Sequence, residues 1–291
     1  MEREAPTFHG GRFVLERELG RGHFGVVYAA FDRVRGEQVA LKAAPGRAAG
    51  VKREFSVLES IGHPNVVRAL ECFHRDTLPF FTMELIAGDD FVSHVRRRGE
   101  LEPPPAALRD SIPIAMGEPV REPLSTAFIP CSALGIERLR HILPQTAEAL
   151  DAIHVAGYVH GDLQPSNVLV TEEGRPVVLD LELAGDTTEN VDLLGTAAYL
   201  APEHGEPGRF GPAVDWYSLG VMVFEAITGQ VPFEGHGPDV LARKQATNPP
   251  DPAELVGRVP DDLRTITLGL LRTQPGGRFG ITEVLRTLTP S

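Results

Sequence analysis

Two acidic residues and one amide have the types and the spacing that phosphoryl transfer needs. Asp162 and Asn167 lie in residues 160–167 (HGDLQPSN), and Asp180 follows an apolar stretch thirteen residues later. A carboxylate such as Asp162 can orient or accept the proton of a hydroxyl, whereas an amide oxygen and a second carboxylate can ligate Mg²⁺ against phosphates. Asp and Asn in a loop are usually turn formers, but the ordered set predicts phosphoryl-transfer chemistry.

A glycine-rich stretch and one lysine precede this set. Gly20, Gly22 and Gly25 leave bare backbone that a phosphate chain can approach closely, because glycine has no Cβ to clash. On its own this pattern also fits a plain glycine-rich hairpin. Lys42 ends the mostly apolar stretch Val-Ala-Leu-Lys, and a lysine in a buried strand needs an anionic partner. Glu54, in the next predicted helix, can supply that partner.

The elements that must position these residues begin with an antiparallel sheet. Residues 12–44 alternate strand, glycine turn, strand, turn and strand, and the β-rich stretch after the glycines argues against a dinucleotide-binding fold. A helical pattern covers residues 51–61, and two more strands are predicted over residues 66–73 and 80–85. Gly88 then breaks the pattern and is a candidate hinge between two lobes.

The second half of the chain is predicted to be mainly helical. Prolines crowd residues 100–135, which we interpret as an irregular insertion because proline at that density forbids a long helix. A helix is predicted over residues 136–156, and residues 168–170 and 177–179 read as a buried hairpin. From Asp215 to the end the pattern is mostly helical.

Composition and charge exclude several classes of protein. Hydrophobic residues make up 42% of the chain, which is enough for a sizeable core. The formal net charge of -12 argues against a general binder of nucleic acid or of anionic membranes. We interpret Arg96-Arg97-Arg98 as a solvated helix end. Cys72 and Cys131 have no zinc or disulfide spacing, and neither a signal peptide nor an apolar span is found, so a cytoplasmic protein is expected.

Taken in chain order, the motifs resemble those of the protein kinase superfamily over residues 11–288, apart from the insertion. The matching pieces are the glycine loop, residues 39–42 (VALK), Glu54 before residues 63–65 (HPN), residues 83–85 (MEL), residues 160–167, residues 195–203 (GTAAYLAPE) and residues 215–220 (DWYSLG). Arg278 matches a late arginine that pairs with the Ala-Pro-Glu glutamate, here Glu203. The GTAAYLAPE segment resembles the Ser/Thr-specific branch, and the general composition resembles bacterial kinases.

The resemblance implies a fold and an activity. The fold is α+β and bilobal, with an N-lobe (residues 11–86) of antiparallel sheet plus one helix and a mainly α-helical C-lobe (residues 87–288). The activity is that of a serine/threonine-protein kinase, which uses ATP and Mg²⁺ to phosphorylate Ser/Thr hydroxyls of protein substrates. The sequence is silent on substrate identity and on oligomeric state.

The resemblance also assigns roles residue by residue. Asp162 would be the catalytic base, Lys42 would hold the α- and β-phosphates, Glu54 would position Lys42, and Thr196 would help to form the shelf for the acceptor hydroxyl. Asn167 and Asp180 would bind Mg²⁺. The nucleotide would contact Gly20, Gly22, Gly25, Val27, Ala40, Lys42, Glu84, Ile86 and Leu169. The gatekeeper would be Met83, and the hydrophobic spine would include Leu58, His160 and Leu181.

Three residues depart from the family pattern. Gly161 replaces the arginine that often clamps a phosphorylated activation segment, which makes the chain a non-RD type. Gln164 replaces the lysine that usually neutralises the transferring phosphate, and loss of that cation would slow the chemistry by about 10²-fold. Glu182 replaces the glycine of Asp-Phe-Gly and restricts backbone flips there.

These departures leave other functions open. One is a pseudokinase that binds nucleotide or partners as a regulatory module. Another is a peptide or small-molecule phosphotransferase, because HGDLQPSN with a later Asp-Leu-Glu also resembles aminoglycoside phosphotransferases and the kinase domains of lanthionine synthetases. The retention of Lys42, Asp162, Asn167 and Asp180 favours a working enzyme. The C-terminal motifs favour a peptide platform over a small-molecule site.

Overall fold

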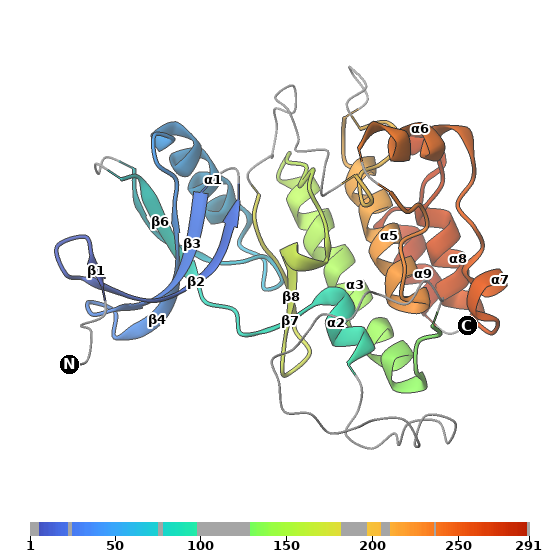
Figure 1. Cartoon of the computed structure of the whole chain (residues 1–291), viewed down its shortest axis with the longest axis horizontal. Helices are drawn as coiled ribbons and strands as arrows, with labels where there is room; N and C mark the ends of the chain where they lie inside the picture. Colours follow the sequence, from blue (N-terminus) through green and yellow to red (C-terminus); the bar gives the residue numbers. More distant parts are fainter. Residues whose placement is uncertain are drawn as a thin grey trace.

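A six-stranded antiparallel sheet with one helix beside it forms the N-terminal lobe (Figure 1). The computed structural model describes residues 6–22, 25–74, 78–97, 129–181, 197–204, 210–235 and 237–289 of the chain. The strand order is β1-β2-β3-β4-β6-β5. The strands are β1 Thr7–Phe8, β2 Phe13–Gly22, β3 Gly25–Asp32, β4 Glu37–Ala43, β5 Ala69–Phe73 and β6 Phe80–Glu84. The antiparallel sheet expected from the sequence is therefore present, and it also includes the short β1 before residue 11.

Local chemistry explains the register of the central strands. The side chain of Asp32 accepts hydrogen bonds from the backbone N–H groups of Val34 and Arg35, which closes the turn between β3 and β4. Asp32 also accepts from Arg12, and this bond is the main reason why the pKa of the Asp32 carboxyl is lowered. Residue pairing then runs without a bulge from Asp32 opposite Glu37 through the whole length of β4.

Helix α1, Ala48–Ile61, packs beside β5 and β6 and carries Glu54 (Figure 1). Its buried residues recur at helical spacing: Val51, Glu54, Val57 and Leu58. Gly62 ends the helix with a φ of 55°, a left-handed conformation that glycine adopts without strain. The helix begins three residues earlier than the sequence pattern indicated, a shift that is common at helix ends.

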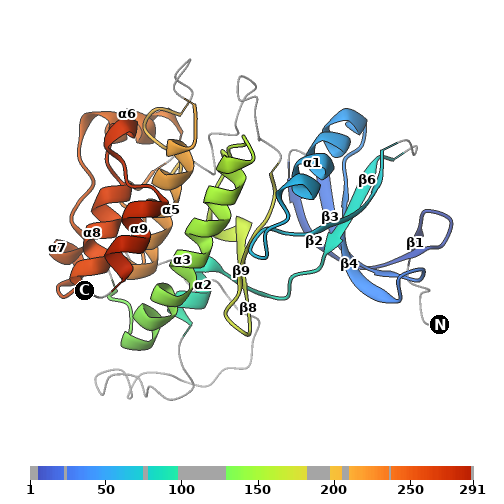
Figure 2. The ribbon, with the colours of Figure 1, turned by 180° about the vertical axis from the view of Figure 1, so that it is seen from behind.

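The C-terminal lobe is mainly helical, as expected, and also contains a small three-stranded sheet (Figures 1 and 2). The sheet has the order β7-β8-β9, with β7 Gly88–Asp90, β8 Val168–Thr171 and β9 Pro176–Val178. The helices are α2 Phe91–Arg96, α3 Ala133–Val155, α5 Ala213–Thr228, α6 Pro238–Ala246, α7 Pro252–Val256, α8 Asp261–Leu270 and α9 Ile281–Leu288. In this part of the chain no described helix has the length and apolarity that a membrane crossing requires.

Helix α5 is the core of the C-terminal lobe, because nearly all of its residues are buried. Gly220 lies where α5 meets α8, and a Cβ at this position would be 2.8 Å from the Cβ of Leu270. Glycine therefore permits the close approach of the two helices. The helix ends at Gly229, whose φ of 83° again favours glycine.

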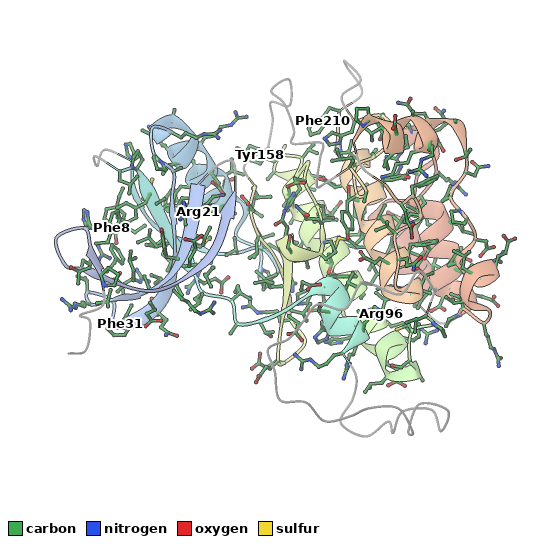
Figure 3. All side chains as sticks on the ribbon, viewed as in Figure 1. Phe8, Arg21, Phe31, Arg96, Tyr158 and Phe210 are labelled. Atoms are coloured by element: carbon green, nitrogen blue, oxygen red, sulfur yellow. The ribbon has the colours of Figure 1, made fainter. Side chains whose placement is uncertain are left out.

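Three features of this lobe differ in detail from the sequence pattern. Gly88, where the pattern breaks, is the first residue of β7, opposite Thr171 of β8. Helix α3 begins at Ala133, inside the expected insertion, because Ser132 caps it by accepting from the N–H of Gly135. Arg96 (Figure 3) is not simply solvated, since its guanidinium donates to the carbonyls of Ala226 and Ile129. Residues 98–128 lie outside the described parts of the chain.

Backbone and side-chain bonds join the two lobes behind the site. Val67 donates to the carbonyl of Val178 at 2.9 Å, and Val178 donates to that of Asn65 at 2.8 Å. The Asn65 amide donates to Pro176 O at 2.7 Å. These bonds tie the loop after α1 to β9 and so fix where Asp180, two residues beyond β9, lies relative to the N-terminal lobe.

Candidate active site

Lys42 lies between two carboxylates at the junction of the lobes. Strand β4 holds it opposite Val27 of β3 and Phe81 of β6, and its side chain is almost completely buried. Its Nζ is 2.9 Å from Glu54 Oε1 and 2.6 Å from Asp180 Oδ1. Lys42 and Glu54 thus form the ion pair that the sequence predicted. Removing either partner would leave a buried charge uncompensated, which is strongly unfavourable.

Asp180 is held in an unusual backbone conformation. Its φ is 59°, a left-handed value that Asp tolerates better than most residues but that still carries strain. Partial burial alone would raise the pKa of its carboxyl, but the Lys42 ammonium outweighs that effect and lowers the pKa. Asp180 is therefore ionised at neutral pH and faces the same space as Lys42.

The two carboxylate oxygens of Asp162 differ in their hydrogen bonding. Gln164 Nε2 donates to Asp162 Oδ2 at 3.2 Å, whereas Oδ1 is buried and has no hydrogen-bond partner among the described residues. Burial is the main cause that raises the pKa of Asp162, to about 6, and the like charge of Asp180 contributes. A largely buried carboxylate with an unused oxygen and a pKa close to neutrality can accept a proton from a bound hydroxyl.

A buried aspartate on α5 positions the loop that carries Asp162. The two Asp215 oxygens accept from the backbone N–H groups of His160 and Gly161, both at 2.8 Å, and from His154 Nε2. Gly161 has a φ of 79°, so glycine fits this position without strain. His160 is also fixed, because its Nδ1 accepts from Asp162 N–H and its Nε2 therefore donates to the carbonyl of Leu179.

Asn167 and Asp180 form a suitable donor pair for Mg²⁺. The Asn167 amide nitrogen donates to the carbonyl of Asp162 at 2.8 Å, which leaves the amide oxygen as the side-chain atom able to ligate a cation. In the described parts of the chain there is no cage of three or more His, Cys, Asp or Glu residues. Mg²⁺ commonly takes only one or two protein ligands and completes its shell with phosphates and water. The residues present therefore fit a nucleotide-bound Mg²⁺.

The glycine stretch forms the ends of β2 and β3. A Cβ on Gly20 or Gly22 would meet nothing within 4 Å, so these residues present open backbone. Gly25 differs, because its φ is 148° and a Cβ there would collide with the carbonyl of Ala43. Gly25 is thus required by packing, whereas Gly20 and Gly22 leave room for a ligand.

The residues expected around an adenine ring come from both lobes. Val27 and Ala40 lie on the neighbouring strands β3 and β4, Leu169 lies on β8, and Ile86 lies between β6 and β7. The side chain of Glu84 is turned away from that space, because it accepts from Arg68 N–H and pairs with Arg175. The part of Glu84 that would contact a base is therefore its backbone, as predicted for the segment that connects the lobes.

The predicted pair of Arg278 and Glu203 is present, and the residues predicted for the hydrophobic spine are buried. Arg278 Nη1 and Nη2 lie 2.6 Å and 3.0 Å from the two Glu203 oxygens, and both side chains are almost completely buried. Leu58 and Leu181 belong to one buried core, and His160 is fully buried. Thr196 and Glu182 lie outside the described residues, so the roles predicted for them remain predictions.

Sequence reasoning missed three side chains that hold the backbone of residues 197–202. Ser218 Oγ donates to the carbonyl of Tyr199, Lys244 Nζ donates to three carbonyls, and Gln245 Nε2 donates to that of Pro202. Ser218 lies within a recognised motif, but neither α6 residue does. The unusual burial of Lys244 depends on tertiary packing, which the sequence pattern does not report.

Comparison with known proteins agrees with this geometry. Residues 13–288 match the family described as the protein kinase domain. The serine/threonine-protein kinase PkaA of Streptomyces coelicolor is 31% identical over 306 residues, which cover 96% of this chain and 50% of the relative. The DNA damage-responsive serine/threonine-protein kinase RqkA of Deinococcus radiodurans is 30% identical over 279 residues, covering 91% of this chain and 37% of that protein.

The serine/threonine-protein kinase PknA of Mycobacterium tuberculosis is 29% identical over 274 residues, which cover 92% of this chain and 58% of PknA. The chain thus spans about half the length of the curated relatives that it matches. The bacterial type expected from the composition and the Ser/Thr class expected from the motifs both agree with these relatives. On its motifs, its geometry and these matches, the chain belongs to the protein kinase family.

Proposed function

We propose that this chain phosphorylates Ser/Thr hydroxyls of protein substrates and uses ATP and Mg²⁺ to do so. One observation carries the proposal: Lys42, paired with Glu54, also contacts Asp180, and Asp162 keeps one carboxylate oxygen without a hydrogen-bond partner among the described residues. This set combines a cation for phosphates, a carboxylate for a metal and a carboxylate for a hydroxyl proton. The names of the relatives support the Ser/Thr class.

Each residue of the set has a defined task in this proposal. Lys42 binds the α- and β-phosphates, and Glu54 keeps its ammonium in place. Asn167 and Asp180 hold Mg²⁺, which when bound neutralises charge on the phosphates. Asp162 orients the acceptor hydroxyl and takes its proton as the new oxygen–phosphorus bond forms and the bond between the γ-phosphorus and the bridging oxygen breaks, releasing ADP.

Gly161 and Gln164 adapt this scheme. With Gly161 there is no arginine beside Asp162 to bind a phosphorylated segment, so we propose a non-RD kinase that does not depend on such a clamp. Gln164 gives Asp162 a neutral hydrogen bond in place of a cation.

The proposed kinase domain covers residues 11–288, with lobes at residues 11–86 and 87–288. The proposed location is cytoplasmic, and the free thiols of Cys72 and Cys131 support it.

A pseudokinase is the second candidate function, and the Gln164 contact favours it. The amide occupies one oxygen of the carboxylate that would take the proton. A stabilising thermal shift with ATP and Mg²⁺ but no turnover would identify a pseudokinase. Turnover only with small hydroxylated molecules would identify a small-molecule phosphotransferase. The buried pair of Glu203 and Arg278 supports the peptide platform of protein kinases instead.

The decisive experiment compares phosphate transfer by matched variants. The wild type is incubated with labelled ATP, Mg²⁺ and a generic basic protein, beside Asp162→Asn, Lys42→Ala and the control Lys52→Ala, whose side chain is exposed on α1. We expect transfer by the wild type and the Lys52 variant and a loss of about 10²-fold or more in the other two. Equal labelling of the substrate protein by all four kinase samples would refute the kinase proposal.

A further inference from the structure

Residues 197–202 form an irregular segment whose carbonyls are held almost entirely by side chains. The segment belongs to no helix or strand. Lys244 Nζ donates to the carbonyls of Ala197, Ala198 and Leu200 at 3.0, 2.6 and 2.7 Å. The other bonds to carbonyls of this segment are donated to Tyr199 by Ser218, to Ala201 by the backbone of His204 and to Pro202 by Gln245.

Lys244 is the main support, and its chemistry suits that task. It is one of only three lysines among the 28 Lys and Arg residues of the chain. Its side chain is 1% exposed, and it makes no ion pair with a described carboxylate. An ammonium is a compact group with three N–H donors on one nitrogen, so it can satisfy three carbonyls that converge on one point, whereas the donors of arginine are spread over a planar fork.

The burial of this cation has a cost that the carbonyls offset. Burial lowers the pKa of Lys244 to about 7. The neutral amine has only two N–H donors, so the three carbonyl oxygens favour the protonated form and oppose that shift. A lysine kept in such an environment serves the backbone that it binds, since no described carboxylate pairs with it.

The segment and helix α6 lie side by side in both ribbon views (Figures 1 and 2). Lys244 and Gln245 are consecutive residues of α6. Through their bonds to Ala197 and Pro202 they attach the helix to both ends of residues 197–202. The side chains of Ala197, Phe233 and Val240 form a small apolar cluster on the same side. The position of the segment thus depends on α6 rather than on a strand partner.

We propose that Lys244, assisted by Gln245, is a positioning residue that orders residues 197–202 as the surface against which the acceptor peptide docks. The proposal rests on the proposed function for its substrate, but the ordering of the segment can be measured without any activity. The hydrogen bonds of Lys244 go to this segment and not to Lys42, Asp162 or Asp180, so its loss affects peptide use more than ATP use.

The test uses Lys244→Met, with Lys52→Met as the matched control on the exposed face of α1. Amide hydrogen exchange is measured for residues 197–204, and KM and kcat are measured for a Ser/Thr peptide and for ATP. In Lys244→Met we expect exchange in this segment and KM for the peptide to rise by about 10-fold or more, because three charge-assisted bonds are lost. KM for ATP should stay within about twofold of the wild type.

Several outcomes would overturn the proposal. One is unchanged amide exchange in residues 197–204. Another is an equal fold-change in KM for the peptide and in KM for ATP, together with a lower melting temperature. A wild type that transfers no phosphate would refute the proposed function alone, and exchange would then decide the role of Lys244. If Lys244→Met does not fold, Gln245→Leu, which removes the bond to Pro202, replaces it. Exchange in that variant identical to the wild type would also contradict the proposal.

Discussion

Replacing Gln164 by lysine should move the acid limb of the pH profile. In the wild type a neutral amide donates to Asp162 Oδ2 at 3.2 Å, and the pKa of Asp162 is raised to about 6. Activity requires the ionised carboxylate, so it is lost as the pH falls through about 6. An ammonium near this carboxylate favours the ionised form and lowers its pKa by about 1–3 units.

The expected magnitude follows from these values. With a pKa of about 6, roughly a quarter of Asp162 is ionised at pH 5.5, whereas with a pKa of about 4.5 the ionised fraction is roughly 90%. Relative to its own value at pH 7.5, Gln164→Lys should therefore retain about fourfold more activity at pH 5.5 than the wild type does.

The assay is kcat/KM for a peptide substrate between pH 5 and pH 8 at constant ionic strength, since this parameter reports ionisation in the free enzyme. Gln38→Lys is the control, because it makes the same chemical change at an exposed position of β4. The reasoning fails if the wild-type limb lies near pH 4, or if Gln164→Lys and Gln38→Lys have the same profile.

Three other substitutions, one of them with a matched control, test the supports of the site. Arg278→Ala leaves the buried Glu203 carboxylate unpaired and should lower the free energy of unfolding in urea by about 3–5 kcal/mol. Arg140→Ala removes a partly exposed pair and should cost less than about 1 kcal/mol, so equal losses would contradict the argument. Gly161→Arg forces a side chain onto a φ of 79° and should destabilise by about 1–2 kcal/mol in the same assay; an unchanged midpoint would count against it. Asp215→Asn places an NH₂ group against a backbone N–H and should lower kcat about 10-fold or more, with the KM for ATP unchanged. A change confined to the KM for ATP would disprove that role of Asp215.

Local patterns in the sequence predicted most secondary structure correctly. The hairpins of the N-terminal sheet, α1 and the hairpin of β8 and β9 were predicted, because turn residues and apolar periodicity are properties of neighbouring residues. The errors occurred where distant contacts decide. Gly88 was interpreted as a break in the secondary-structure pattern, but β8 supplies the partner that makes it part of a strand. The start of α3 was hidden by the prolines that precede its cap at Ser132.

For the site, the sequence by itself determined which groups are available and in what order. Glycines, a lysine, a glutamate and the set of Asp162, Asn167 and Asp180 occur at spacings that carry their own chemical meaning. Only the tertiary structure decided their contacts. The bond between Lys42 and Asp180 joins residues 138 positions apart, and the burial of Lys244 requires α6 to lie against residues 197–202. Spacing along the chain constrains neighbours, but burial and partner choice depend on which distant surfaces pack together.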